Sequence, residues 1–505
     1  MRKKRLANNT LSSLILQITT IICGFILPKL ILSNFGSDVN GLVNSITQFL
    51  QIFAFLDLGV GAVFQSSLYK PLADNDIVKI SEIYVSGQKF FTRLAEILLG
   101  YVIVLIVVYP FIANQNFGFT YTATLIVAMS VSSFAQYYFG MANGLFLTAD
   151  QRGYIQYNVQ IITLILNTLS CYILIYLGAS IHIVKMTTSL IYLIRPIVLK
   201  VYVDKHYSIN KKAVYTDEPI KQKWNGLAQH IASVVLDSTD TIVLTVFSTL
   251  ANVSIYSVYY LVISGLKQLF NATTNGIQAL IGELYARQEK DELKKVFGWT
   301  EWLIHTMTTF IFGCAGVLII PFIMIYTKGI VDADYNQPSF SVILIIAYAM
   351  YCIRLPYHIA IKAGVHYKET QHCYWIAAVM NLITSVVLVN KWGLIGVAIG
   401  TLVAMTYQTV WMAIYDSENI IYWPIKSFVK QIIVDILISV IGVIATKNIK
   451  ITNYSYYKWF IAAVEVAIIW GIVVVVVNWI FYRENLKRLT QGLKNNRWIK
   501  DVWCD

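Results

Sequence analysis

Long apolar segments recur along the whole chain and are separated by short polar ones. Residues 97–108, 318–326 and 468–477 lie inside windows of about 20 residues with almost no charge, the length that a helix needs to cross a bilayer core of about 30 Å. Only helices or a closed barrel satisfy the backbone in that core. A barrel would show short segments of alternating polarity. The pattern therefore predicts an all-α integral membrane protein.

The apolar segments predict about fourteen transmembrane helices. The first six are expected at 11–33, 42–69, 90–113, 121–147, 154–177 and 181–201. The next six are expected at 225–249, 253–281, 299–327, 338–364, 371–389 and 394–415, and a last pair at 428–446 and 459–482. The opening apolar stretch has no small-residue cleavage site, so we interpret it as the first helix and not as a signal peptide.

The two halves of the chain resemble each other when one is shifted by about 214 residues, as in transporters built from repeats. The shift pairs Asn167 in "ILNTLS" with Asn381 in "VMNLITS", and Asp57 with Asn271. Chance similarity between apolar segments is the alternative explanation. Because the repeat holds an even number of helices, we expect two parallel six-helix repeats.

The expected organisation follows from these helices and from the repeat. A cytoplasmic N-terminus precedes an N-terminal lobe, a cytoplasmic linker, a C-terminal lobe, two extra C-terminal helices and a cytoplasmic tail, at 1–10, 11–201, 202–224, 225–415, 428–482 and 483–505 respectively.

Composition and charge placement fix the environment. Hydrophobic residues make up 57% of the chain and charged residues 13%, with a mean hydropathy of +0.62; a soluble domain carries about 25% charge. Of the 39 Lys and Arg, 29 lie at the N-terminus, in or beside the even-numbered loops and in the C-terminal tail, against 5 in the odd-numbered loops. The positive-inside rule then predicts that both termini are cytoplasmic, in a plasma membrane. The net charge of +12 therefore indicates topology and not nucleic-acid binding.

Polar residues at helical spacing mark one face of several expected helices. They are Ser13, Gln17, Thr20 and Gly24; Gln156, Gln160, Thr163, Asn167 and Ser170; Gln229, Ser233, Asp237 and Asp240; Ser264, Gln268, Asn271, Asn275 and Gln278; and Tyr351, Arg354 and His358. Such stripes also join packed helices, at about 0.6 kcal/mol per hydrogen bond. Their spread over both repeats favours a water-filled cavity between the two bundles.

Ionisable residues near the middle of apolar helices cost about 2.5 to 3.5 kcal/mol each on insertion, so they usually face a cavity or a partner. We expect Lys267 and Arg354 to bind an anionic substrate group such as a pyrophosphate, with Arg195 and Lys29 as further substrate-binding candidates. Lys29, Lys185 and Arg195 lie nearer helix ends, where snorkelling to the headgroups is the alternative.

Carboxylates in the same cavity suit a coupling cation, Na⁺ or H⁺. The candidates for this cation-coupling role are Asp57, Asp237 and Asp240. A structural ion pair of one of them with Lys267 or Arg354 is the alternative. The chain has no Walker A motif, and its six cysteines form no Cys-x-x-Cys pair, so we expect no cofactor and identify no metal ligands.

The order of several motifs resembles a known family. They are Gly24-Phe25, Phe35-Gly36 followed by Gly41-Leu42, "FLDLGVG" with Asp57, Gly59 and Gly61, "LDSTDTIVLTVF", and the segment 381–393. Over essentially the whole chain they resemble the polysaccharide-unit (Wzx-type) flippases, which move lipid-linked oligosaccharides, of the multidrug/oligosaccharidyl-lipid/polysaccharide exporter superfamily.

The resemblance implies two lobes around a central cavity and alternating access. The substrate would be an undecaprenyl-diphosphate-linked oligosaccharide repeat unit, moved from the inner to the outer leaflet of a bacterial plasma membrane for capsule, exopolysaccharide or O-antigen biosynthesis. A polysaccharide polymerase, glycosyltransferases and the membrane lipids would be its partners. The extra helices at 428–482 would form a groove for the lipid tail.

Three alternatives remain. Lipid II flippases place arginine in the middle of the first helix, whereas this chain has only Lys29, beside Pro28. Multidrug cation antiporters of the superfamily usually have twelve helices. A membrane-embedded polysaccharide polymerase needs a sizeable outer loop with catalytic residues, and the loop 328–337 offers only Asp332 and Asp334.

Overall fold

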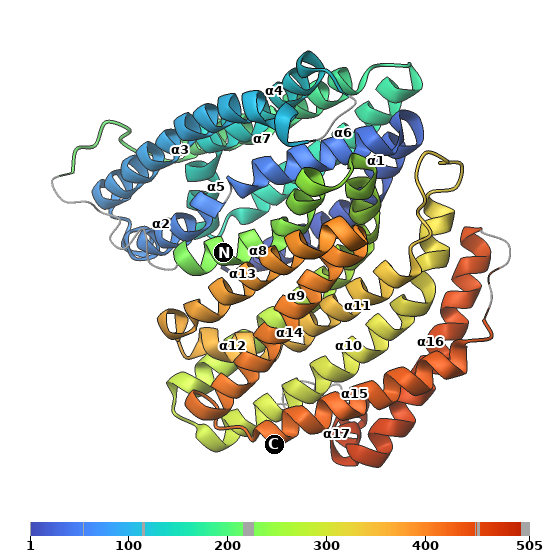
Figure 1. Cartoon of the computed structure of the whole chain (residues 1–505). Coiled ribbons are helices and arrows are strands. Elements are labelled where there is room, and N and C mark those ends of the chain that lie inside the picture. Colours follow the sequence, from blue (N-terminus) through green and yellow to red (C-terminus); the bar gives the residue numbers. More distant parts are fainter. Residues whose placement is uncertain are drawn as a thin grey trace. The chain divides into compact units, whose positions relative to one another are not determined.

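The computed structural model describes residues 2–53, 55–113, 117–215, 227–449, 451 and 455–495. These residues form helices and connecting turns, with no strand among them (Figure 1). Within this part of the chain, 12 helices are long and apolar enough to span a membrane. The prediction of an all-α membrane protein is therefore confirmed.

The chain divides into two compact units, Met1–Ser254 and Ile255–Asp505. Unit 1 contains α1 (Arg2–Ile52), α2 (Phe55–Asp74), α3 (Ile77–Ile112), α4 (Phe119–Ala135), the π-helix η1 (Gln136–Gly140), α5 (Met141–Ala149), α6 (Gly153–Tyr176), α7 (Ile181–His206), α8 (Leu227–Phe247) and the first turn of α9 (Leu250–Ala286). The lobe boundaries expected from the repeat stay a prediction.

Unit 2 begins within α9. It continues with α10 (Lys290–Tyr326), α11 (Pro338–Ile353), α12 (Leu355–Ala363), α13 (Tyr367–Trp392), α14 (Leu394–Asn419), α15 (Ile425–Thr446), α16 (Tyr456–Phe481) and α17 (Arg483–Asn495). The expected helix at 338–364 is thus α11 and α12, which are separated at Arg354.

The second expected helix, 42–69, differs from what the structure shows. Its first part belongs to α1, which runs across a kink at Gly36, and its second part is α2. Gly36 has φ 82°, a backbone conformation that glycine adopts without steric cost. Helical periodicity does not reveal such a kink, because the apolar pattern continues on both sides of it.

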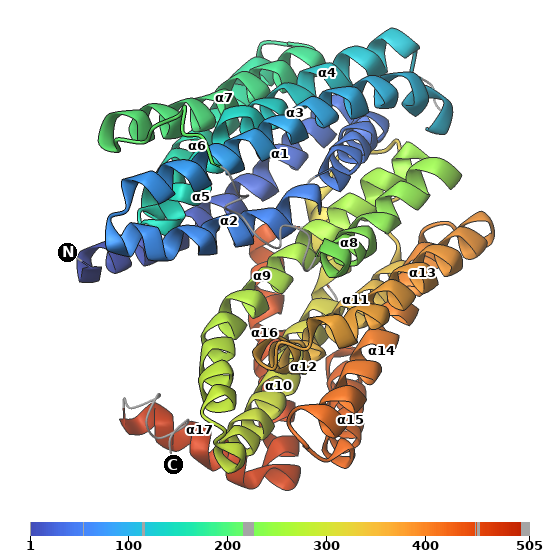
Figure 2. The same cartoon turned by 90° about the vertical axis from the view of Figure 1, so that its left-hand side faces the viewer.

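The N-terminus and the even-numbered loops of unit 1 meet at one end of that unit (Figure 2). Asp150 pairs with Arg5 at 3.4 Å and with Arg152 at 3.0 Å, and it accepts a hydrogen bond of 2.5 Å from the Tyr207 hydroxyl. We call these four residues the Asp150 cluster. It joins the start of α1 to the α5–α6 turn and to the end of α7, as an alternation of loops between two membrane faces requires.

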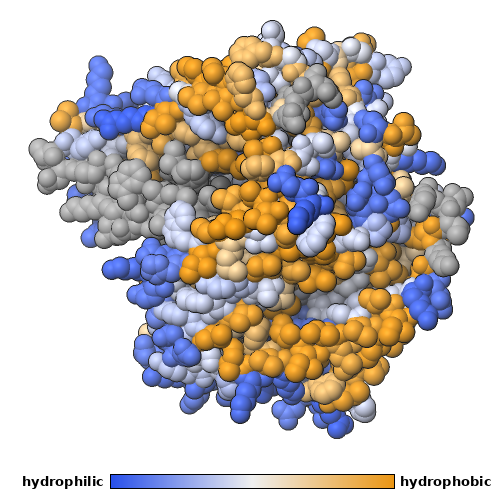
Figure 3. Space-filling view, in the orientation of Figure 1, coloured by the Kyte–Doolittle hydropathy of each residue, from blue (hydrophilic) through white to orange (hydrophobic). Residues whose placement is uncertain are grey.

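The last two transmembrane helices pack on α10 in unit 2. Trp470 of α16 lies against Gly313 of α10 and Gly442 of α15, where any side chain would collide with the indole ring. Trp302 of α10 donates a 2.6 Å hydrogen bond from its Nε1 to Asn478 of α16. The opposite faces of α15 and α16 expose large apolar residues, seen as orange surface in Figure 3.

The repeated asparagines occupy equivalent places in the two halves. Asn167 of α6 donates to the hydroxyl of Tyr192 in α7 at 3.2 Å, and Asn381 of α13 donates to Thr401 of α14 at 3.1 Å. Both asparagines are buried. Each therefore joins its helix to the next one along the chain.

Candidate substrate and coupling sites

Lys267 and Arg354 lie together in unit 2, on two sides of one aromatic ring. The Nζ of Lys267 is 4.5 Å from the ring centroid of Tyr351, and the Cζ of Arg354 is 4.8 Å from the same centroid. Lys267 is also 5.0 Å from the ring centroid of Tyr348, and its Nζ is 3.4 Å from the hydroxyl of Tyr260. We call these five residues the cation–tyrosine site.

Both cations of this site are buried. Lys267 is 8% exposed and Arg354 is 6% exposed. Tyrosine rings attract cations through the negative face of the π-system, so they stabilise the charges where water is scarce. The chain places one cation on α9 and the other at the end of α11.

Arg354 lies at the break between α11 and α12. The break follows from Pro356, which has no N–H and whose ring crowds the carbonyl group four residues earlier. The Nη1 of Arg354 is 3.9 Å from the sulfur of Met405. Its Nε is buried and has no acceptor among the described residues. A guanidinium group with unused donor capacity suits an oxyanion ligand.

Unit 1 contains two adjoining cavities of about 410 and 390 Å³, which share Ser132, Ser133, Tyr137 and Tyr192 in their walls. Lys185 lines the first cavity and Arg195 the second. The Nε of Arg195 donates a 2.7 Å hydrogen bond to Thr163, and its guanidinium group stacks 3.9 Å from the ring centroid of Tyr192.

The polar stripe expected on the helix 154–177 faces these cavities. Gln156 and Gln160 line the Arg195 cavity and Asn167 lines the Lys185 cavity, while Thr163 holds Arg195. The opposite wall includes η1, which packs where Pro196 follows Arg195 in α7. Such π-turns frequently occur at functional sites.

The charge of the cavity walls is one-sided. Among the described residues that line the two cavities, the charged ones are Lys185 and Arg195, and none is Asp or Glu. The α1 residues in these walls include Leu27 and Ile31, on either side of Lys29, which is half-buried. Arg195 thus faces a cavity, as expected of a substrate-binding residue.

Of the expected coupling residues, the structure describes one side chain. Asp240 is 2% exposed in α8, within unit 1. The side chains of Asp57 and Asp237 lie outside the described residues. The structure therefore brings Lys267 and Arg354 together in one unit, and Arg195 and Asp240 lie in the other.

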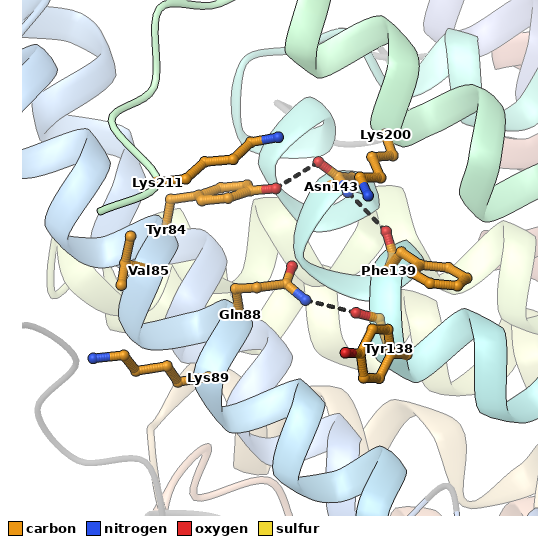
Figure 4. Close-up of a pocket in the computed structure, with 9 residues that line it drawn as sticks. All are labelled: Tyr84, Val85, Gln88, Lys89, Tyr138, Phe139, Asn143, Lys200 and Lys211. Carbon is orange, nitrogen blue, oxygen red and sulfur yellow. Dashed lines mark hydrogen bonds between the residues drawn. The ribbon is translucent and has the colours of Figure 1, made fainter. Parts of the chain in front are cut away.

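A smaller pocket of about 290 Å³ opens in unit 1 near the ends of α3 and α7 (Figure 4). Lys89, Lys200 and Lys211 lie around it. Tyr84 donates a 2.8 Å hydrogen bond to Asn143 at its floor. Lys211 is paired with Asp204, outside the pocket wall, at 2.5 Å. By the expected topology this basic pocket lies on the cytoplasmic face.

An apolar groove of about 370 Å³ runs along α15 in unit 2. Val429, Ile433 and Leu437 form its floor at helical spacing, and Lys426 and Lys430 line it near the start of the helix. Its shape and chemistry fit an amphiphile with an anionic head and an apolar tail.

One group of residues was not expected from the sequence. Glu301 and His305 of α10 are buried together with Asp435 of α15. The i, i+4 spacing of Glu301 and His305 was a usable signal. It was overlooked because Glu301 lies near the start of an expected helix, where a charge usually reaches water.

No protein-family profile and no curated protein matches the chain. Solved structures do match. An inward-facing multidrug resistance MATE family transporter of the MOP superfamily superposes with a TM-score of 0.61 at 14% identity, over 79% of this chain and 94% of its own. The Vibrio cholerae MATE transporter VcmN gives 0.56 at 12%, over 82% and 97%.

A MOP superfamily transporter from Pyrococcus furiosus, described by a reversed polarity of its binding pocket, gives a TM-score of 0.57 at 11% identity, over 82% of this chain and 96% of its own. At these identities the likeness shows the fold. The chain has the fold of the MATE transporters of the MOP superfamily, which agrees with the superfamily expected from the sequence resemblance.

Proposed function

We propose that this protein is a flippase that moves an undecaprenyl-diphosphate-linked oligosaccharide from the inner to the outer leaflet of a bacterial plasma membrane by alternating access. The resemblance in sequence and the likeness in fold both support a carrier of this superfamily. The surface polysaccharide made from the unit would be a capsule, an exopolysaccharide or O-antigen. Glycosyltransferases and a polymerase would act before and after this step.

The observation that carries the proposal is the sign of the buried charge. Lys267 and Arg354 share one tyrosine ring in unit 2, and Lys185 and Arg195 line the cavities of unit 1. Buried cations repel a cationic drug and attract a diphosphate, with which Arg forms bidentate hydrogen bonds. In this proposal the cation–tyrosine site binds the diphosphate, and Arg195 and Lys29 contact the substrate along its path.

The groove on α15 supports a lipid-linked substrate. Its apolar floor at Val429, Ile433 and Leu437 suits a polyprenyl tail, and Lys430 near one end suits the phosphates. In this proposal Asp57, Asp237 and Asp240 bind the coupling cation, Na⁺ or H⁺.

The second candidate is a multidrug cation antiporter, because the structural neighbours are multidrug MATE transporters. A lipid II flippase is a variant of the first proposal with another lipid-linked diphosphate. Loss of drug resistance, of cell-wall growth or of surface polysaccharide in a deletion strain distinguishes the three.

The test is complementation of a strain that lacks the gene and any substitute flippase. We expect Lys267→Ala and Arg354→Ala to lower surface polysaccharide roughly 10- to 100-fold, the equivalent of losing about 1.5 to 3 kcal/mol of charged hydrogen bonding. Lipid-linked units should accumulate on the inner leaflet. Lys391→Ala, at an exposed lysine beyond this site, is the matched control.

Membrane insertion of each variant is checked by its amount in the membrane fraction. Full activity of both inserted variants would remove the proposed diphosphate site. Normal polysaccharide in the deletion strain, together with raised drug sensitivity, would favour the antiporter.

A further inference from the structure

Unit 2 buries a cluster of ionisable side chains at the junction of α10, α12, α14 and α15. Its acidic and imidazole members are Glu301, His305, Asp416 and Asp435, which are 3%, 0%, 1% and 6% exposed. Glu301 and His305 lie one turn apart on α10, while Asp416 belongs to α14 and Asp435 to α15. We call these four residues the acid–histidine cluster.

Short hydrogen bonds hold two of the carboxyl groups. The Nδ1 of His305 is 2.6 Å from one oxygen of Asp435, and Thr309 donates to the other oxygen at 2.9 Å. The Tyr357 hydroxyl donates to Glu301 at 2.6 Å, and the indole Nε1 of Trp423 donates to its second oxygen at 2.8 Å. Three helices and the α14–α15 turn therefore meet at these two carboxyl groups.

The other two groups have unused capacity. Neither carboxyl oxygen of Asp416 has a hydrogen-bond partner among the described residues, and the same is true of the Nε2 of His305. Asp416 interacts electrostatically with Tyr357, the residue that donates to Glu301, so its carboxyl group belongs to the cluster. Burying an ionised carboxylate without a donor is so unfavourable that the group takes up a proton instead.

The charge balance of the cluster points the same way. Three carboxylates and one neutral imidazole would carry three negative charges, and no Lys or Arg forms an ion pair with them among the described residues. The other titratable side chains facing the cluster are Tyr357 and Tyr482, which add no positive charge. Like charges at this depth cannot all persist, so protons must neutralise the cluster.

We propose that Glu301, His305, Asp416 and Asp435 form a proton-binding site that holds protons in this conformation and releases them during transport. The described His, Cys, Asp and Glu form no group that could hold a metal ion, which favours H⁺ over Na⁺ at this place. The release step rests on the proposed transport function, whereas the presence of the protons does not.

The position of Asp435 suggests how protons and lipid interact. Asp435 faces α10, and its neighbours along α15, Ile433 and Leu437, lie in the apolar groove. Deprotonation would place unbalanced negative charge between α10 and α15 and weaken their contact. A tail in the groove and a proton at Asp435 therefore act on the same helix from its two sides.

Infrared spectroscopy of the purified full-length protein in lipid vesicles tests the protons directly, with H⁺ as the only ligand. At neutral pH we expect a carboxylic-acid C=O band that loses intensity in Glu301→Gln, Asp416→Asn or Asp435→Asn. Asp334→Asn, at an exposed loop residue, is the matched control and should leave the band unchanged. A band that none of the three cluster variants alters would overturn the proposal.

The same variants test release. Because an amide resembles the protonated acid, Glu301→Gln and Asp416→Asn should keep the thermal unfolding midpoint of the wild type yet lose complementation. A purely structural cluster would leave complementation intact, and that result would overturn the coupling role. Loss of activity in Asp240→Asn alone would assign coupling to the residue expected from the sequence.

The two proposals fail in different ways. If the intact gene supports no polysaccharide export while the cluster variants still lower the infrared band, the proposed substrate is wrong and the proton site stands. If export depends on the gene and the band is insensitive to the cluster, the proton site is wrong and the flippase stands.

Discussion

Single residues decide how closely the helices approach each other. A side chain at Gly41 of α1 would place its Cβ 1.9 Å from the backbone oxygen of Leu250, the first residue of α9. A backbone atom cannot rotate away as the tip of a long side chain can. Gly24, in the same helix, has open space at this position, with nothing within 4 Å.

We therefore expect Gly41→Ala and Gly24→Ala to have opposite effects. Gly41→Ala should lower the stability of the folded protein by about 1 to 3 kcal/mol, through overpacking. Gly24→Ala should be neutral or stabilising, because alanine favours a helix over glycine by about 1 kcal/mol. Thermal unfolding of the purified variants in detergent measures both effects. Equal midpoints for the two variants would contradict the close approach of α1 to Leu250.

The sequence could identify residues whose chemistry conflicts with their surroundings. Lys267 and Arg354 stand out because a charge in the middle of an apolar helix has few explanations, and the structure brings them to one tyrosine ring. It could not predict Asp416 in the same way. Asp416 lies at the end of α14, where an acid normally meets water, and only the packing of neighbouring helices buries it.

Whole elements are joined by contacts that lie outside the membrane-spanning segments. In the Asp150 cluster, Tyr207 follows the end of α7 and donates its hydroxyl hydrogen to Asp150. Burial, followed by this hydrogen bond and by the negative charge of Asp150, raises the pKa of Tyr207 above its ordinary value of 10.0. The folded protein therefore holds the neutral phenol more strongly than the unfolded chain does.

The sign of the pH dependence follows from that shift. The stabilisation is complete below about pH 10 and falls as the pH rises further, because the unfolded chain ionises first. Tyr207→Phe should lower stability by about 1 kcal/mol at neutral pH and reduce the loss between pH 8 and about pH 11. Thermal unfolding across this range measures it, with Tyr457→Phe at an exposed tyrosine as control. An equally steep loss in Tyr207→Phe would refute the assignment.

Helices were more predictable than their interruptions. Long apolar windows gave α3, α6 and α7 within a few residues, since burial in lipid requires a continuous helix. The kink at Gly36 and the break at Arg354 were not predicted, because the apolar pattern runs through both. Pro356 was the one local signal for the second.

At the scale of the whole molecule, the distribution of Lys and Arg predicts which ends of the helices face the cytoplasm. The contacts of the Asp150 cluster show that the N-terminus and two even-numbered loops share one end of unit 1. The side of the membrane on which that end lies remains a prediction from charge.

Cysteine labelling in intact cells tests this topology. Single cysteines at exposed Lys328 and Lys391 should react with an impermeant maleimide from outside. Cysteines at exposed Lys70 and Lys290 should react only after the membrane is permeabilised. The unsubstituted protein is the control, since its described cysteines are buried or half-buried. Outside labelling at Lys290 would reverse the orientation.

The break at Arg354 makes α12 a separate rod of nine residues, Leu355–Ala363. Arg354 stands at its first end, and Tyr357, which holds the carboxyl group of Glu301, lies about one helical turn further on. A tilt of this short rod about the break would pull on the guanidinium group and on that carboxyl group in a single movement. The chain thus carries a mechanical lever through which capture of an anion and loss of a proton can be timed to each other.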